Sequence, residues 1–326
     1  MLFRSGLHWH RSGPRCNGSS GAYPYTLLPC ADGLVCLICR ARDEWGRLVA
    51  AMGDPPWSAE PRYRDLRAMG TQYPAEVDAK LAPWLATRSR DSLLALGLEH
   101  SIPMAPVRTL AEVLRTPQFD ARRAWEALPT DAGTARAPAL PFVVHATGGA
   151  PLRAPEAPHA APARRATDPS RPLAGLRVLD LGWVWSAPLL AGLLTEFGAE
   201  VIKVEHGGRL DAMRMRGRPL RDGAPMPGPS IELSPSFHQA NHGKLGATLD
   251  LKHPEGLALL RRLVADADVL VENMSPGALA RAGLDDDALA AVNPRLVVLS
   301  MSAAGQHGPG AAMRAYAPGQ IGRAHV

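Results

Sequence analysis

The sequence lacks several features that would assign its class directly. No segment approaches the roughly 18 to 20 consecutive apolar residues that a membrane-spanning helix needs, and the first residues lack the zones of a signal peptide. The arginines behind the net charge of +5 are scattered, so no dense basic run indicates a nucleic-acid surface. The sequence therefore predicts a cytoplasmic globular protein with no membrane or nucleic-acid partner, and leaves anionic small molecules as candidate ligands.

Cysteine is scarce, with four residues in the chain, and their spacing does not predict a metal site. Cys36 and Cys39 form a C-x-x-C pair, but no second pair follows at zinc-finger spacing. Both lie in the apolar run 34–39, which predicts a buried strand. Buried structural cysteines are therefore favoured over a metal or redox site.

The first zone of the chain, residues 23–144, mixes a strand with several helical stretches. We expect the strand at 33–39 and helices near 43–52 and 75–87. Thr109-Leu110-Ala111-Glu112 is a capping box, which satisfies backbone donors at the start of a helix. A short helix should therefore begin at Leu110.

Prolines then recur every few residues from Pro138 to Pro172, which predicts an extended linker. From Leu173 onward the pattern becomes an alternation of strands and helices. The predicted strands are 177–181, 200–205, 269–272 and 296–302, and the predicted helices are 188–197, 276–283, 286–292 and one that begins at Pro254. This alternation predicts an α/β fold, a parallel sheet with flanking helices, preceded by a small α+β segment.

Two predicted strand-to-helix crossovers offer backbone N–H groups to an anion. One leads from Gly182 to a helix near Pro188, and the other is Ser275-Pro276-Gly277. Helix N-termini attract phosphate through free N–H donors and the helix dipole. Two of them at strand ends suit a ligand with several phosphates, bound beyond the carboxyl edge of the sheet. For either terminus alone, a helix start that merely caps itself is the favoured interpretation.

A dinucleotide site competes for the first crossover, because a strand, a helix and a strand ending in Glu205 imitate the start of a Rossmann fold. The crossover lacks the G-x-G-x-x-G pattern. Trp183 and Trp185 stand in the turn where glycines would let a pyrophosphate approach. The sequence therefore disfavours NAD binding.

A series of motifs in the last zone follows a family order. These are LAGLRVLD at 173–180, FGAEVIKVE at 197–205, LDLK at 249–252, VENMSPG at 271–277, NPRLV at 293–297 and GQHGP at 305–309. Together they resemble the N-terminal part of the class III CoA-transferases, the CaiB/BaiF family, which includes formyl-CoA transferase.

The first zone is similar to the later part of the same family, through YTLLPCADG at 25–33 and IPMAPVRTLAEV at 102–113. A late part before an early part implies a tandem fusion or a circular permutation, and the proline-rich linker favours the fusion. The expected segments are the later part of a first copy at 1–145, the linker at 146–172, the CoA-binding start of a second copy at 173–320, and an adapter-derived scar at 321–326. The chain is therefore expected to be a fragment of a tandem enzyme.

The resemblance implies a site for coenzyme A and no metal. The family's contacts fall on Trp183, Val184, Trp185, Ser186, Leu249, Lys252, Asn273, Met274, Arg281 and Arg314. Lys252 and Arg281 have the charge that phosphates need, although each basic residue alone would be interpreted as a solvated charge. Trp183 and Trp185 replace the small or polar residues common in this loop. They would reshape the acyl end of the pocket, or one would stack on adenine.

The family's mechanism uses an aspartate nucleophile that attacks the donor thioester and forms mixed anhydrides and an aspartyl-CoA thioester. In both copies that aspartate falls outside this chain, so no catalytic residue is predicted here. Asp180 is interpreted as a structural residue at the end of a strand. The isolated chain is expected to be inactive.

The resemblance also implies what the intact protein does. It would move CoA between an acyl-CoA thioester and a carboxylic acid, as a homodimer or through pairing of its tandem copies. Two alternatives stay open. One is a racemase of 2-methylacyl-CoA thioesters with the same fold, and the other is a non-catalytic module that binds CoA.

Overall fold

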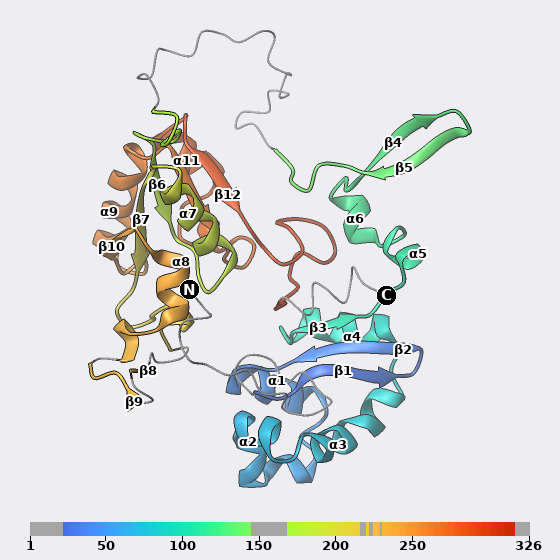
Figure 1. Cartoon of the computed structure of the whole chain (residues 1–326). Helices are drawn as coiled ribbons and strands as arrows, with labels where there is room; N and C mark the ends of the chain where they lie inside the picture. The colour runs from blue at the N-terminus through green and yellow to red at the C-terminus, as the bar shows by residue number, and fades with distance from the viewer. Residues whose placement is uncertain (1–21, 145–167, 216–219, 222–223, 229, 317–326) are drawn as a thin grey trace. The chain divides into compact units, whose positions relative to one another are not determined.

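The computed structural model describes residues 22–144, 168–215, 220–221, 224–228 and 230–316. They divide into two units (Figure 1). The described residues between 22 and 141, together with 303–316, form the antiparallel unit, and those between 142 and 302 form the parallel unit. The scar expected at 321–326, Cys16 and most of the expected linker lie outside the described residues.

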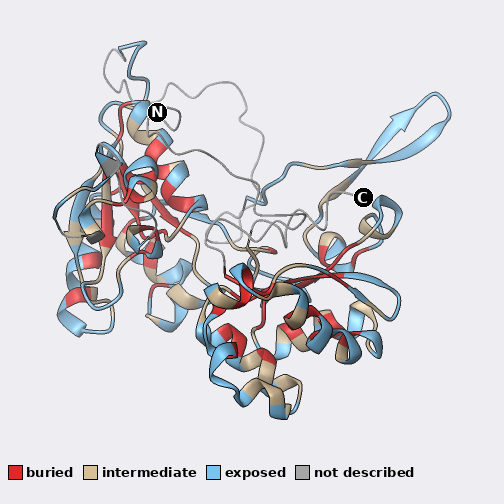
Figure 2. Ribbon diagram, turned by 60° about the horizontal axis from the view of Figure 1, so that its bottom comes forward, coloured by how far each residue is buried: buried red, intermediate tan, exposed pale blue. Residues whose placement is uncertain are grey.

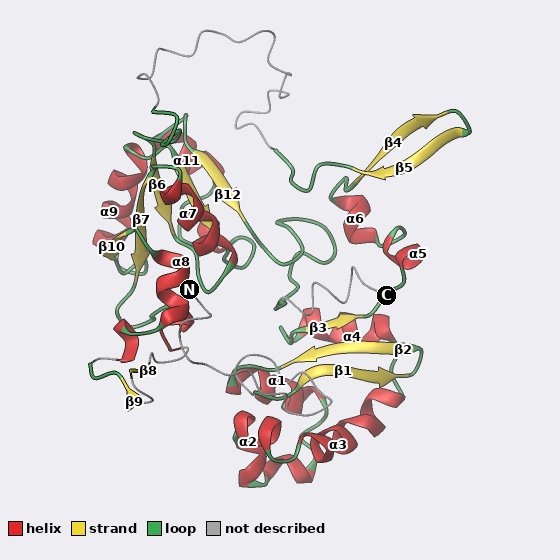
Figure 3. Ribbon diagram, in the orientation of Figure 1, coloured by secondary structure: helices red, strands yellow, loops and turns green. Residues whose placement is uncertain are grey.

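A five-stranded sheet in the order β10-β7-β6-β11-β12 organises the parallel unit, and all its neighbouring strands are parallel (Figure 3). This confirms the predicted α/β fold. The strands of this unit are β6 (Arg177–Asp180), β7 (Glu200–Glu205), β8 (Leu220–Arg221), β9 (Ala224–Pro225), β10 (Leu245–Thr248), β11 (Val269–Glu272) and β12 (Val297–Ser300). Its helices are α7 (Ser186–Glu196), α8 (Pro235–Asn241), α9 (Pro254–Ala265), α10 (Ala278–Arg281) and α11 (Asp286–Val292).

Helices cover both faces of this sheet because successive residues of a strand point to opposite faces. Val178 of β6 packs in one buried cluster with Ala187 and Ala191 of α7. Its neighbour Leu179 belongs to a different cluster, which includes Leu260 of α9. Strand β6 is therefore buried on both sides, as central strands of parallel sheets usually are.

The antiparallel unit is built on a three-stranded sheet in the order β1-β2-β3, with antiparallel pairing throughout. The strands of this unit are β1 (Tyr25–Cys30), β2 (Gly33–Ile38), β3 (Met104–Pro106), β4 (Trp125–Thr130) and β5 (Gly133–Pro138). Its helices are α1 (Arg42–Ala51), α2 (Leu66–Thr71), α3 (Pro74–Ala86), α4 (Arg90–Glu99), α5 (Leu110–Val113) and α6 (Pro117–Ala121). The capping box at Thr109 and the helix start at Leu110 are confirmed.

The core of the antiparallel unit is apolar and aromatic. Tyr63, Leu81 and Leu93 are fully buried in one cluster with Leu37 of β2 and Leu48 of α1. Figure 2 shows buried residues gathered on the strands and inner helix sides of each unit, whereas the hairpin of β4 and β5 is exposed along most of its length. This hairpin was not predicted, because its polar, proline-containing strands lack the apolar alternation of a half-buried sheet.

Gln118 of α6 holds the returning segment 303–316 within the antiparallel unit. Its Nε2 donates to the carbonyl oxygens of Ala304 at 2.6 Å and His307 at 2.8 Å. Its Oε1 accepts the N–H of Gly310 at 2.5 Å. Gln118 is 3% exposed, so a single buried amide fixes three points of the segment.

Two helices of the parallel unit begin elsewhere than predicted. Helix α7 starts at Ser186, two residues before Pro188; a proline is tolerated there because first-turn N–H groups have no acceptor within the helix. Helix α10 begins at Ala278, preceded by Gly277 at φ 73° with no side-chain cap. The predicted Ser275 cap and Pro276 start are therefore wrong, since those residues form a turn.

The two cysteines of the C-x-x-C pair are free, and both are buried, as predicted. Burial raises the pKa of the Cys36 thiol to about 11, so the thiolate needed for metal binding or redox chemistry is scarce at neutral pH. No helix in the described ranges has the length and apolarity to cross a bilayer.

Candidate functional site

The carboxyl edge of the parallel sheet brings together most of the residues assigned to CoA binding. Because the strands are parallel, their carboxyl ends lie at one edge. Residues 183–186 follow β6, Leu249 and Lys252 follow β10, and Asn273 and Met274 follow β11. Arg281 closes α10, the next helix in the chain. Arg314 differs from the rest, because it belongs to the antiparallel unit.

Asn273 fixes the loop that follows β6. Its side-chain Oδ1 accepts the N–H of Trp183, and its Nδ2 donates to the Trp183 carbonyl, both at 2.7 Å. Nδ2 also donates to Ser186 Oγ at 3.0 Å. The side chain thus pairs with both the N–H and the carbonyl group of Trp183. Asn273 and Trp183, both predicted to contact CoA, are therefore hydrogen-bonded to each other.

The two tryptophans of this loop differ in their surroundings. The Arg209 guanidinium lies 4.6 Å from the centre of the Trp183 ring, a cation–π contact. Trp185 is 44% exposed and precedes the first turn of α7. Trp185 is therefore the indole that remains accessible to a ligand, and Trp183 is partly covered by its own chain.

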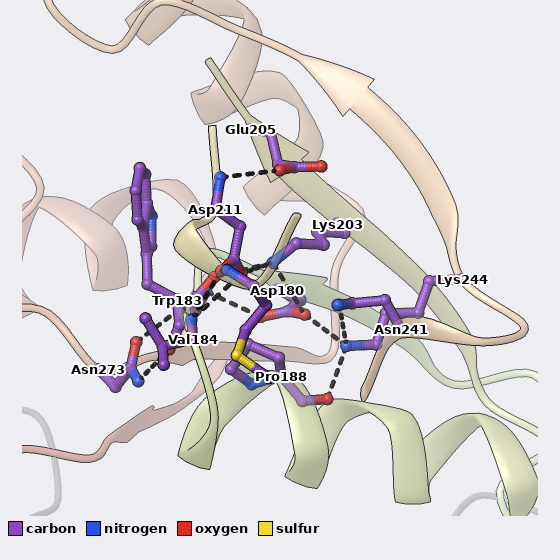
Figure 4. A network of polar contacts seen from close by, with 12 residues as sticks. Asp180, Trp183, Val184, Pro188, Lys203, Glu205, Asp211, Asn241, Lys244 and Asn273 are labelled. Atoms are coloured by element: carbon purple, nitrogen blue, oxygen red, sulfur yellow. Dashed lines mark hydrogen bonds and ion pairs between the residues drawn. The ribbon is translucent and has the colours of Figure 1, made fainter. Parts of the chain in front are cut away.

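A buried network of four charges lies beneath the loop (Figure 4). The side chains of Asp180, Lys203, Asp211 and Lys244 are each 3% exposed or less. Lys244 Nζ donates to Asp180 Oδ2 at 2.7 Å and to the Pro188 carbonyl of α7 at 2.6 Å. Two ammonium groups thus balance two carboxylates, as burial of charge requires.

Burial also affects one of the two ammonium groups. It lowers the pKa of the Lys244 ammonium, and the neighbouring Asp180 carboxylate opposes that shift. Asp180 also accepts the N–H of Gly182 at 2.8 Å. Its interpretation as a structural strand-end residue agrees with these contacts.

The loop that leads from Gly182 to the helix offers fewer free backbone donors than expected. The N–H groups of residues 182–185 all donate within the protein. Three of the acceptors are the side chains of Asp180, Asn273 and Asp211. The start of α7 itself has no side-chain cap, so its first-turn N–H groups stay candidate donors for an anion, beside the side chains at this edge.

Exposed cations are available for that task. The Lys252 side chain is exposed, while its backbone N–H donates to Asp250 Oδ1 at 2.9 Å. Arg281 Nη1 donates to the Pro276 carbonyl at 3.3 Å and leaves the rest of the guanidinium exposed. These groups fit a phosphorylated ligand. In the described part of the chain, no group of three or more His, Cys, Asp or Glu residues could hold a metal ion.

Comparison with known proteins identifies the family. The family model described as CoA-transferase family III matches residues 5–160 and 173–320. The chain belongs to CoA-transferase family III.

Relatives of this family III chain are similar over different lengths. The probable CoA-transferase Rv1866 of Mycobacterium tuberculosis is 32% identical over 307 residues, 90% of this chain and 37% of that protein. The succinyl-CoA–L-malate CoA-transferase beta subunit of Chloroflexus aurantiacus is 42% identical over 143 residues, 44% of this chain and 33% of that protein. A CAIB/BAIF family protein from Brucella suis has a solved structure that is 37% identical, covering 45% of this chain and 37% of that one, with a TM-score of 0.40. The chain thus spans about a third of the length of these relatives.

The sequence analysis missed the charged side chains that contact the loop after β6 and hold it in place. Lys203 lies in β7 and Lys244 just before β10, and neither was singled out, because a lysine in a sequence is normally interpreted as exposed. Asp211 and Arg209 lie in the connection after β7, which reads as a plain loop. The single available signal is Lys203, a charged residue between the apolar residues Ile202 and Val204 of a strand.

Proposed function

We propose that this chain is the CoA-binding portion of a class III CoA-transferase that moves CoA between an acyl thioester and a carboxylic acid. The observation that carries this proposal is the gathering of the loop 183–186, Lys252 and Asn273 at one edge of a parallel sheet. That edge is where open α/β sheets bind their ligands. Family membership supplies the reaction class.

In this proposal each group at the edge has a separate task. Asn273 and the buried charges set the shape of the loop after β6. Lys252 and Arg281 supply positive charge for the phosphates. Trp185 offers an exposed indole face for adenine or for the acyl end of the thioester.

The names of the relatives suggest which donors to try first. Those from Chloroflexus aurantiacus are named for succinyl-CoA with L-malate or D-citramalate, and one from Rhodopseudomonas palustris for formyl-CoA with oxalate. We propose an acyl-CoA donor and a small carboxylic acid as acceptor in the whole protein. We also propose that the two matched segments, 5–160 and 173–320, come from tandem copies.

The isolated chain should bind CoA without turning it over, because the family's nucleophilic aspartate is assigned to neither segment. Titration of CoA into the chain, followed by calorimetry, tests the binding. Incubation with succinyl-CoA and malate, followed by chromatography of the thioesters, tests turnover. Saturable binding with no new thioester is expected; turnover by this chain would overturn the claim that it is catalytically incomplete.

A charge substitution locates the site. Lys252→Met should weaken CoA binding about tenfold, which corresponds to about 1.4 kcal/mol, because it removes an exposed cation beside the predicted phosphates. Lys80→Met is the matched control, since Lys80 is an exposed lysine in α3 of the antiparallel unit. Equal affinity in the two variants would place the phosphates elsewhere.

A further inference from the structure

The backbone of Val184 adopts a conformation that its side chain disfavours. Its φ is 63°, in the left-handed region. A β-branched residue there is a genuine outlier, because its Cβ crowds the backbone. Such strain persists only when neighbouring groups hold it in place. The loop after β6 therefore depends on something that keeps Val184 in this state.

Asp211 is the group that holds Val184. Its Oδ1 and Oδ2 lie 3.2 Å and 3.1 Å from the Val184 nitrogen and accept its N–H together. Oδ1 also accepts the N–H of Met213 at 2.9 Å. Asp211 is 1% exposed, so water cannot easily replace it as the acceptor. Figure 4 shows its carboxylate directed at the loop.

Lys203 connects this carboxylate to the other side of the same loop. Its Nζ lies 3.5 Å from Asp211 Oδ2 and donates to the Gly182 carbonyl at 2.9 Å. One buried ammonium therefore contacts the residue before Trp183 and the carboxylate that holds the residue after it. Lys203 is 3% exposed, so this contact, like Asp211 itself, is shielded from water.

The connection after β7 contacts the loop a second time. Arg209, two residues before Asp211, lies over the Trp183 ring at 4.6 Å. The same short segment thus contacts the loop twice: Arg209 lies over the Trp183 ring, and Asp211 accepts the N–H of Val184. If the loop were only a turn, a glycine at position 184 would adopt the same φ without strain, and no such contacts would be needed to hold it. The strained valine and its contacts therefore indicate a further role for the loop.

We propose that Asp211 is a positioning residue of the CoA site, which is set by Lys203 and holds Val184 in its left-handed conformation so that residues 183–186 present the surface that binds CoA. The inference rests on the proposed function for its ligand. Asp211 itself does not touch CoA, and it acts through the loop. Its effect should therefore depend on which residue stands at position 184.

Asp211→Asn is the informative change, since it preserves size but replaces one acceptor oxygen by an NH₂ group. In place of Oδ1 that group would face the N–H groups of Val184 and Met213, and in place of Oδ2 it would face the Val184 N–H and the Lys203 ammonium, all of which are donors. Hydrogen exchange of residues 182–186 should accelerate about tenfold or more, because the loop opens more often. CoA binding should weaken about tenfold.

A double-mutant cycle with Val184→Gly separates positioning from a general structural role. Glycine tolerates φ 63° without strain, although its freedom should itself cost some affinity. In the Val184→Gly background, Asp211→Asn should weaken CoA binding by less than about threefold, a non-additivity expected of coupled residues. Equal losses in both backgrounds would overturn the proposal.

Asp268→Asn is the matched control. Asp268 also accepts a backbone N–H, that of Arg177 at 2.9 Å, but at the amino edge of the same sheet. It should leave exchange at 182–186 unchanged. If the wild-type chain does not bind CoA, the proposed function fails, while the exchange measurement still reports on the positioning. Unaltered exchange at 182–186 in Asp211→Asn would refute the positioning even if CoA binds.

Discussion

The two units of the molecule differ in where their ion pairs lie. In the parallel unit, Lys203 and Asp211 are 3% and 1% exposed and lie under a loop at the carboxyl edge of the sheet. In the antiparallel unit the core is apolar and aromatic, and Arg90 keeps its ion pair with Glu112 at 18% and 34% side-chain exposure. Among the described residues, ion pairs with both side chains buried therefore occur in the parallel unit, whereas those of the antiparallel unit keep both side chains at least 17% exposed.

This difference suggests a role for the buried ion pairs of the parallel unit. Buried ion pairs often stabilise a protein less than apolar side chains of the same size would. Their presence beneath residues 182–186 is therefore poorly explained by stability alone, and we infer that it serves the geometry of the loop. The antiparallel unit shows the reverse pattern, an apolar core whose ion pairs fix surface turns.

Removal of one buried cation should have the largest effect. Lys244→Met leaves Asp180 buried without its closest partner, at 2.7 Å. Breaking such a pair costs about 3 to 5 kcal/mol, so the parallel unit should unfold at a much lower denaturant concentration. Urea unfolding followed by hydrogen exchange in β6 and β11 measures this loss.

Lys252→Met provides the contrast for that experiment, because Lys252 is exposed at the same edge of the sheet. It should change the free energy of unfolding by no more than about 0.5 kcal/mol. If Lys244→Met were as mild as Lys252→Met, the buried network would not hold the parallel unit, and the comparison between the units would fail.

Truncation of the apolar core should come next. Leu81→Ala removes a fully buried side chain of α3 and should destabilise the antiparallel unit by about 2 to 5 kcal/mol. Exchange at residues 182–186 should stay unchanged, because Leu81 contributes to a core of the other unit. Faster exchange at both places would show that the two units unfold together.

The smallest expected effect is a pH dependence at the surface of the antiparallel unit. The Arg90 guanidinium, helped by the Thr109 N–H, lowers the pKa of Glu112 from 4.5 to about 2. A depressed carboxyl pKa stabilises the fold fully above pH 4.5, and the contribution is lost as the pH falls towards 2.

The measurement is urea unfolding of the wild type and of Glu112→Gln between pH 7 and pH 3. The wild type should be more stable at pH 7, and the difference should shrink below pH 4.5. Glu99→Gln, which changes an exposed carboxylate in α4, should show little difference at any pH. A constant gap between wild type and Glu112→Gln would contradict the assigned ion pair.

Strands with an apolar run were predictable from the sequence almost to the residue. The predicted strands 200–205 and 269–272 are β7 and β11, and the predicted helix 286–292 is α11. These elements are buried on at least one face, so the spacing of their apolar residues in the sequence reflects which face is buried. Strand β10 was missed, because Leu245 and its neighbours are largely exposed at the edge of the sheet and carry no such pattern.

The site was predictable only in part, and for a different reason. Trp183 and Asn273 belong to motifs that point to the carboxyl edge, but their contact joins positions 90 apart in the chain. The network of Lys203, Asp211 and Lys244 likewise depends on contacts between separate segments. Apart from the position of Lys203 between apolar residues of β7, no local pattern marks these side chains as buried, so their partners appear only in the folded structure.

The hydrogen-exchange footprint of CoA on the wild-type chain tests the central claim most directly. With saturating CoA, exchange should slow at residues 182–186, 249–252 and 273–281, which all follow strands of the parallel sheet. Exchange in the core helices α3 and α4 of the antiparallel unit should not change. Protection confined to the antiparallel unit, or no protection at any CoA concentration, would contradict the assignment of the carboxyl edge as the CoA site.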